Sequence, residues 1–233
     1  MHDARRPDAQ RRAAIAGALA AAGALVRLPA AAMPPADERL APPDTQGGMA
    51  LQQALARRRS VRRFGDRPLA LAAVAQLLWA AQGITASAGW RTAPSAGALY
   101  PLELHLVATR IDGLDAGIYR YLPAGHALQR SPSQATAPAW QQAALGQPAV
   151  GSAAAVVVIA AVEARSAGKY AARAGRYVVF EAGAASQNLA LQAAALGVGS
   201  VVIGAFDDAA ISHLLRLPPG EQPIVLMPIG LPG

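Results

Sequence analysis

The chain contains no cysteine among its 233 residues. This absence excludes disulfides, thiolate nucleophiles, iron–sulfur clusters and cysteine-based zinc sites. The four histidines stand far apart, without the close spacing of metal ligands, so we expect no metal site. Aromatic residues make up only 5% of the chain, and no basic stripe is interleaved with them. We therefore expect no nucleic-acid binding, despite a net charge of +7.

Several common motifs are also missing. Gly197 and Gly199 are followed by Val202, where a dinucleotide-binding fingerprint needs a third glycine. No phosphate-binding loop of the Walker A type occurs, and no serine stands in a Gly-x-Ser-x-Gly elbow. Apolar residues, in contrast, make up 53% of the chain, which favours a packed globular domain over disorder.

The first 32 residues have the order of an export signal. Arginine pairs at 5–6 and 11–12 precede the uncharged residues 13–26, and residues 30–32 are alanines that fit a cleavage site. As a helix, 13–26 would be about 21 Å long, too short for a permanent membrane span. The arginine pairs favour the twin-arginine route, so we expect 1–32 to be a signal and the protein to be periplasmic or otherwise exported. The alternatives are a Sec signal, or an alanine-rich extension of a cytoplasmic protein.

The rest of the chain is expected to be a proline-rich linker or wrapping arm at 33–48, followed by one domain at 49–233. Because helices and strands do not alternate strictly, we expect an α+β fold with a mixed sheet rather than a doubly wound parallel one. The helix expected over 173–196 is apolar almost all round, so it should be buried on most sides, in a dimer seam or in a monomer core. Helices are expected at 49–59, 71–84, near Trp140, 173–196 and 209–215, and strands at 102–109, 117–122, 127–130, 154–162, 200–205 and 223–229.

A cluster of hydrogen-bond donors follows the first expected helix. Arg58, Arg59, Ser60 and Arg62 stand within five residues. Guanidinium groups bind a phosphate monoester with two parallel N–H donors, and a serine hydroxyl adds a third. The segment therefore indicates a phosphate site. The alternative is that these arginines complement the helix C-terminus and stay solvated.

Two further segments are suited to a flat aromatic ligand. In the segment 93–101, Pro94 fixes the chain, Ser95 offers a donor and an acceptor, and the small residues 96–98 let the backbone approach a ring. A strand is expected to end at Gly204, where a main-chain N–H can point at a ring edge. Taken alone, each segment is equally typical of an ordinary turn or strand end.

The order of these motifs resembles the nitroreductase superfamily and is most similar to its SagB/thiazole-oxidase (SagB/ThcOx) branch. The resemblance spans about residues 47–230. It implies a nitroreductase-like three-layer sandwich, with a mixed, mostly antiparallel sheet flanked by helices, and a homodimer with two FMN sites at the subunit interface. The motifs that carry it are Arg-Arg-Ser-x-Arg-x-Phe at 58–64, the segment 91–101, Glu181-Ala182-Gly183 with Gln187-Asn188, and Ile203-Gly204-Ala205-Phe206-Asp207.

The resemblance also implies site residues. Those expected to hold the phosphate and ribityl chain of FMN are Arg58, Arg59, Ser60 and Arg62. Those expected to line the isoalloxazine ring, from the partner subunit, are Pro94, Ser95, Ala96 and Ala98. The Gly204 amide would face flavin N5, with Ile203 beside it. Lys169 and Tyr170 resemble a Lys-Tyr pair implicated in the azoline-oxidising branch, and their alternative is a solvated loop pair.

The expected function is that of an FMN-dependent oxidoreductase, which transfers hydride through flavin N5 to or from a small or peptide-derived substrate. A cytoplasmic enzyme would use NAD(P)H, whereas an exported one would need a quinone, a partner redox protein or oxygen. Two departures from the family pattern bear on flavin retention. Many relatives have asparagine where Ala98 stands, and many have a basic residue near the C-terminus, whereas residues 230–233 here carry none. The alternative is a non-catalytic flavin- or partner-binding module of the same fold.

Overall fold

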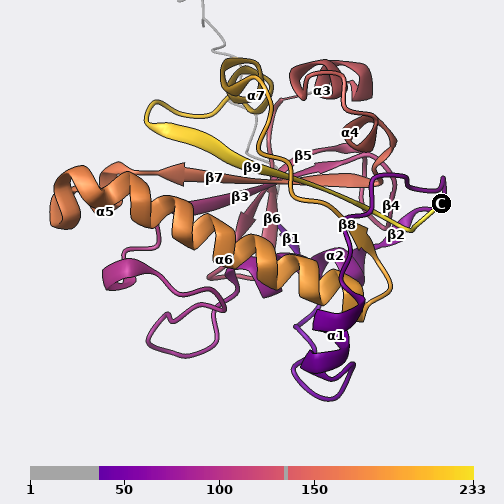
Figure 1. Ribbon diagram of the computed structural model, residues 1–233, viewed down its shortest axis with the longest axis horizontal. Coiled ribbons are helices and arrows are strands. Elements are labelled where there is room, and N and C mark those ends of the chain that lie inside the picture. Colours follow the sequence, from indigo (N-terminus) through magenta and orange to yellow (C-terminus); the bar gives the residue numbers. More distant parts are fainter. Residues whose placement is uncertain (1–36, 134–135) are drawn as a thin grey trace, which may run out of the picture. The chain divides into compact units, whose positions relative to one another are not determined.

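The structure is a computed structural model that describes residues 37–133 and 136–233 (Figure 1). The expected export signal, residues 1–32, lies outside the described residues. Within the described ranges, no helix combines the length and the apolarity that crossing a bilayer requires.

Within these residues, a seven-stranded sheet runs in the order β1-β6-β5-β3-β7-β9-β8, and every pair of neighbouring strands is antiparallel. The parallel component is a separate two-stranded pair, β2 with β4. The strands are β1 (Glu38–Arg39), β2 (Leu69–Ala70), β3 (Leu102–Ala108), β4 (Ile111–Asp112), β5 (Gly117–Leu122), β6 (Ala127–Arg130), β7 (Ala155–Val162), β8 (Gly199–Ser200) and β9 (Glu221–Gly230).

Helices cover both faces of the sheet, which confirms the expected α+β sandwich. Helices α2 and α6 lie against one face, and α3, α4 and α7 lie against the other (Figure 1). The helices are α1 (Leu51–Arg57), α2 (Leu71–Gln82), α3 (Ala137–Ala143), α4 (Pro148–Ser152), α5 (Ala164–Tyr170), α6 (Ala174–Ala195) and α7 (Asp208–Leu215).

Strand β3 shows how the sheet separates two cores. Side chains alternate along a strand, so Leu104 and Leu106 lie in the core formed with α2 and α6. Val107 lies in the second core, with Trp140 of α3. Glu103 and His105 share the parity of Val107, so the central strand carries two polar side chains on the face covered by α3, α4 and α7.

Part of the expected linker belongs to the sheet. Glu38–Arg39 pairs with the edge of β6, and the N–H of Leu40 donates to the carbonyl of His126 at 3.0 Å. The Leu40 side chain is buried in the core with α2 and α6. This portion of 33–48 is therefore an edge strand and packed arm.

Two local expectations were wrong. The strand expected at 200–205 is only the short β8, followed by an isolated bridge at Ile203. Residues 131–152 hold two helices instead of one, because Pro148 in the first turn of α4 begins a new helix after α3. The burial expected for helix α6 is incomplete within the single chain, where Val179 and Phe180 remain 59% and 64% exposed, so its burial in a dimer seam stays a prediction.

Candidate functional site

The cationic segment, Arg57–Arg63, leaves α1 and runs beside β8. The Val61 N–H donates to the Ser200 carbonyl at 2.9 Å, which fixes the path of the backbone. Two glycines allow this close approach. A Cβ built on Gly199 would lie 2.8 Å from the Val61 side chain, and one built on Gly230 would lie 3.0 Å from that of Phe64.

The expected phosphate-binding residues lie together on this segment, but they are not equivalent. The Arg59 guanidinium donates to the carbonyls of Ala56 and Arg58 at 3.0 and 2.8 Å, so it caps the end of α1. The side chains of Arg58, Ser60 and Arg62 have no hydrogen-bond or ion-pair partner in the part of the chain that the structure describes. Unpaired guanidinium groups beside a free hydroxyl are chemically suited to a phosphate.

A pocket of about 160 Å³ adjoins the cationic segment. Arg57 and Arg59 line one side of it, while Ala190 and Ala194 near the end of α6 line the other. Arg57 was not among the residues expected to bind the phosphate, and the structure adds it to the cationic segment beside the pocket.

The loop Pro94–Tyr100, here called the small-residue loop, folds in an unusual backbone conformation. Gly97 has φ +63°, and the non-glycine residues Ala98 and Tyr100 have φ +55° and +46°. Left-handed conformations at non-glycine residues cost energy and persist where surrounding bonds hold them. The Ser95 hydroxyl accepts the Tyr100 N–H at 2.9 Å, and Ala98 donates to the Ser95 carbonyl at 3.0 Å. The loop is therefore a fixed wall of small residues.

Glu181 of α6 anchors this loop. Its carboxylate accepts the Ala96 N–H at 2.9 Å, and the residue is only 5% exposed. Burial raises the pKa of Glu181, while the N–H of Ala96, the Ser95 hydroxyl and the charge of Arg91 oppose the shift in part. In the sequence, Glu181 stands out only as part of a motif. Its neighbour Phe180 is exposed, so the apolar residues around Glu181 do not reveal that its partner is internal.

The structure brings Lys169 and Tyr170, at the end of α5, to the same loop. A Cβ built on Gly97 would lie 2.8 Å from the Lys169 ammonium and 2.9 Å from the Tyr170 hydroxyl. The Tyr170 ring also meets Tyr177 edge-on, with 4.7 Å between centroids. The pair therefore lies beside the small-residue loop, at the end of a helix rather than in a loop, with Tyr170 partly buried and Lys169 exposed.

The two halves of the expected flavin site lie far apart within one chain. The loop is tied to Glu181, in the first half of α6, whereas the pocket at the cationic segment includes Ala194, near its end. Thirteen residues of helix separate the two, which corresponds to about 20 Å. Figure 1 shows the same separation, with α5 at one end of α6 and α1 at the other.

Gly204 lies in the open, as a main-chain donor to a ligand must. A Cβ built there would meet no atom within 4 Å, and its N–H has no protein partner among the described residues. Ile203 differs, because its side chain is 6% exposed and its N–H and carbonyl both pair with Leu226 at 2.9 Å. Ile203 can therefore shape the position of Gly204 but does not present its side chain.

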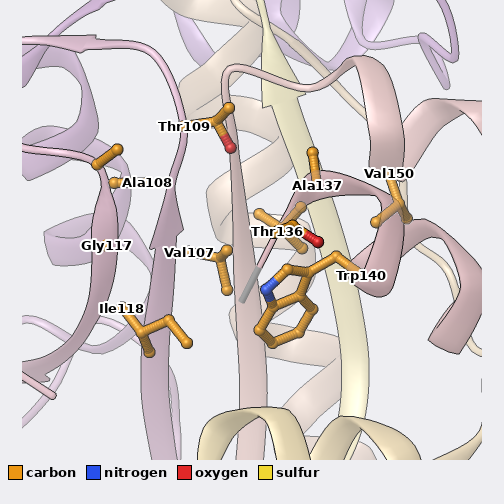
Figure 2. A pocket seen from close by; sticks show the side chains of 11 residues that line it. Val107, Ala108, Thr109, Gly117, Ile118, Thr136, Ala137, Trp140 and Val150 are labelled. Carbon is orange, nitrogen blue, oxygen red and sulfur yellow. The ribbon is translucent and has the colours of Figure 1, made fainter. Parts of the chain in front are cut away.

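A further pocket lies away from all these residues. It encloses about 610 Å³ between β3, β5, β7 and the helices α3 and α4, beside Trp140 (Figure 2). None of its lining side chains is titratable, and none is a candidate site residue. Within the described ranges, no cluster of three or more histidine, aspartate or glutamate side chains is suited to hold a metal.

The chain and its fold match one known family. Residues 55–231 match the profile of the nitroreductase family, and the chain belongs to it. The chain is 39% identical over 180 residues to MJ1384 of Methanocaldococcus jannaschii, a protein assigned to the nitroreductases, in a match that covers 77% of this chain and 90% of that protein. The family relationship makes the protein an oxidoreductase.

Solved structures show the same fold. A crystal structure from Ralstonia eutropha, also assigned to the nitroreductases, has a TM-score of 0.73 at 30% identity, over 84% of this chain and 90% of that one. A chain of the Escherichia coli microcin synthetase McbBCD complex has a TM-score of 0.64 at 22% identity, over 83% and 77% of the two chains.

Proposed function

We propose that the protein is an FMN-dependent oxidoreductase that works as a homodimer. In this proposal each flavin lies between the cationic segment of one protomer and the small-residue loop of its partner. The observation that carries it is the separation of about 20 Å along α6, because Glu181 holds the loop near one end of this helix and the cationic segment lies near the other. The partner's loop would complete the site.

Exposed apolar side chains support association of two chains. Leu51 and Leu55 of α1 are 61% and 51% exposed, and Val179 and Phe180 of α6 are more than half exposed. These helices lie next to the two halves of the site. Large apolar side chains that a monomer leaves exposed commonly mark protein–protein interfaces.

The residues present fit FMN. When bound, FMN supplies a two-electron carrier that accepts or gives hydride at N5. Arg58, Ser60 and Arg62 would hold its phosphate, and the Gly204 N–H would donate to its ring edge. The C-terminal residues lie beside the cationic segment, since the Gly233 N–H donates to the Arg63 carbonyl at 3.3 Å, but they add no cation.

The purified protein is expected to be a yellow dimer that releases FMN, identified by mass, on denaturation. Phe180→Glu is expected to weaken dimerisation at least about tenfold, because a charge replaces an apolar contact, and to lower flavin content with it. Light scattering and the absorption spectrum measure both. Leu145→Glu is the matched control, since Leu145 is 63% exposed but lies outside α1 and α6. A monomeric wild type with full flavin content would contradict the proposal.

We further propose that the substrate is an azoline ring in a modified peptide, as in the SagB/ThcOx branch. The ring would lose a hydride to the flavin and a proton to the Lys169–Tyr170 pair, and so become the aromatic azole. Lysine suits this role because an ammonium can lose its proton, whereas a guanidinium stays charged. Proximity of the pair to Gly97 supports this role, because the loop would face the flavin in this proposal.

The electron acceptor that reoxidises the flavin depends on the compartment in which the protein works. We propose that the protein is exported, so that oxygen, a quinone or a partner redox protein takes the electrons instead of NAD(P)+. A non-catalytic flavin-binding module is the second candidate. It is favoured by Ala98, which offers no side-chain amide, and by a C-terminal segment without a cation.

Stopped-flow mixing separates these possibilities. A thiazoline-containing peptide is expected to bleach the flavin absorbance, and Lys169→Ala is expected to slow this step at least about 100-fold, the size typical of a lost acid–base group. NADPH is expected to bleach it slowly. Rapid reduction by NADPH would contradict export, and a bound flavin that no peptide, quinol or NADPH reduces would favour the non-catalytic module.

A further inference from the structure

Arg165, in the first turn of α5, ties this helix to the sheet and to the small-residue loop. Its guanidinium donates to the Tyr100 carbonyl at 3.0 Å and to one Glu103 carboxylate oxygen at 2.5 Å. The other oxygen of Glu103 pairs with Arg120 of β5 at 2.9 Å. Glu103 is thus held from two sides, and it presents a fixed acceptor to Arg165.

Tyr100 is the residue of the loop that most needs to be held, because it is bulky and left-handed. Its N–H is bound by the Ser95 hydroxyl, and its ring lies 4.6 Å under the Arg91 guanidinium. Arg165 is the group that binds its carbonyl. Removing that bond releases one side of a strained peptide.

Lys169 follows Arg165 by one turn of the same helix, so both side chains lie on one face of α5. Both reach the same loop, Arg165 at Tyr100 and Lys169 at Gly97. On the other side of the pair, α5 ends abruptly at Ala171, with φ +46° and ψ −128°. A continuous helix into α6 therefore does not hold the pair. Tyr170 packs on Tyr177 of α6, and the support of Lys169 lies on the Arg165 side.

We infer that Arg165, held by Glu103, is a positioning residue that keeps Lys169 and Tyr170 against the small-residue loop. The inference rests on the proposed function only for the role of Lys169 and Tyr170, which is to accept a proton from the substrate. The contact geometry does not depend on flavin or substrate. Arg165 itself acts through the loop and through Lys169.

Lys169 is the single lysine of a chain with 20 arginines, so an amine reagent can report on it directly. N-hydroxysuccinimidyl acetate is the probe, with the acetylated peptide counted by mass spectrometry. In Arg165→Ala, the exposed Lys169 is expected to react at least about threefold faster, because its ammonium no longer lies against Gly97. Amide exchange of residues 95–100 is expected to rise at least about tenfold, while that of β7 stays unchanged.

Matched variants separate positioning from general damage. Arg176→Ala removes an exposed α6 arginine that has no ion-pair partner among the described residues, and it is expected to match wild type. Arg165→Lys keeps the charge but loses the planar fork, so an intermediate effect is expected. A rise of β7 exchange in Arg165→Ala would indicate general loss of stability. The milder variants Arg165→Lys and Glu103→Gln then test the positioning role, and they are expected to raise Lys169 acetylation and loop exchange while β7 exchange stays unchanged.

In the flavin-loaded enzyme, Arg165→Ala is expected to lower kcat about tenfold or more while KM changes less than about threefold, as misplacement of reacting groups does. Unchanged acetylation and loop exchange in Arg165→Ala would overturn the inference, whatever the activity. A protein that binds no FMN would overturn the proposed function instead, and the labelling and exchange results would still decide the role of Arg165.

Discussion

Replacing Arg58 and Ser60 together by alanine is expected to leave the purified protein colourless and to weaken FMN binding at least about 100-fold. A hydrogen bond to a charged group contributes about 1.5–3 kcal/mol, so losing two of them corresponds to about 3 kcal/mol or more. A tenfold change in affinity takes about 1.4 kcal/mol, which gives the expected factor. Titration of the stripped protein with FMN, followed by flavin fluorescence, measures it.

The neighbouring arginines supply controls for this result. Arg67→Ala removes an equal charge from an exposed position outside the cationic segment, and flavin content is expected to stay at the wild-type level. Arg59→Ala is expected to have a smaller effect than Arg58→Ala, because the Arg59 guanidinium is already engaged with two carbonyls of α1. If Arg58→Ala/Ser60→Ala retained colour and affinity, the phosphate site would have to lie elsewhere.

Replacing His105 by alanine is expected to destabilise the fold by about 3 kcal/mol, because the buried Glu221 carboxylate loses its hydrogen-bond partner, and leaving a buried charge uncompensated costs about 3–5 kcal/mol. His105 and Glu221 are 6% and 4% exposed, and His105 Nε2 lies 2.5 Å from the Glu221 carboxylate. The variant leaves that carboxylate with Arg120 at 3.7 Å as its nearest positive partner. We therefore expect the lower end of the range, measured by urea unfolding at pH 7.

The loss should depend on pH in a defined direction. Burial alone would raise the pKa of Glu221, but the hydrogen bond and charge of His105, with Arg120, hold the pKa below its usual 4.5. In wild type this pair therefore stabilises the fold above the unfolded pKa, and the stabilisation is lost as pH falls through the lower folded value. Without His105, burial raises the pKa of Glu221, so the variant is penalised most at neutral pH.

The difference between His105→Ala and wild type is thus expected to shrink from pH 7 toward about pH 4, as Glu221 becomes protonated in the variant. His105→Ala/Glu221→Gln is expected to recover part of the stability at pH 7, because the buried charge is removed together with its partner. An equal loss at pH 4 and pH 7 would show that cavity formation, rather than the unpaired carboxylate, is responsible.

Local patterns were sufficient for most elements of the fold. The hairpin of β5 and β6 occupies residues 117–122 and 127–130 as expected, because alternating side chains flank a Pro-Ala-Gly turn. Helix α2 likewise follows its apolar stripe. The exposure of Phe180 could not be predicted in this way. The apolar pattern of a helix is the same whether the helix packs within its own chain or against a second chain.

The candidate site was likewise predictable only in part. Side chains close in sequence, such as Arg58, Ser60 and Arg62, could be grouped from their chemistry alone. The bonds that hold the site could not, because Glu181 and Ala96 are 85 residues apart and Arg165 and Tyr100 are 65 apart. Single-residue properties carry no record of such pairings, which only the sheet and the packing of α5 and α6 create.

Gly199 and Gly230 restrict how this protein can vary. Neither glycine offers a reactive group, yet each leaves just enough room for the cationic segment to lie on the sheet edge, through Val61 and Phe64. Even a single added methyl group there would displace the backbone that carries Arg58 and Arg62. Natural variation at these two inconspicuous positions should therefore be as limited as at the arginines themselves, for steric reasons rather than chemical ones.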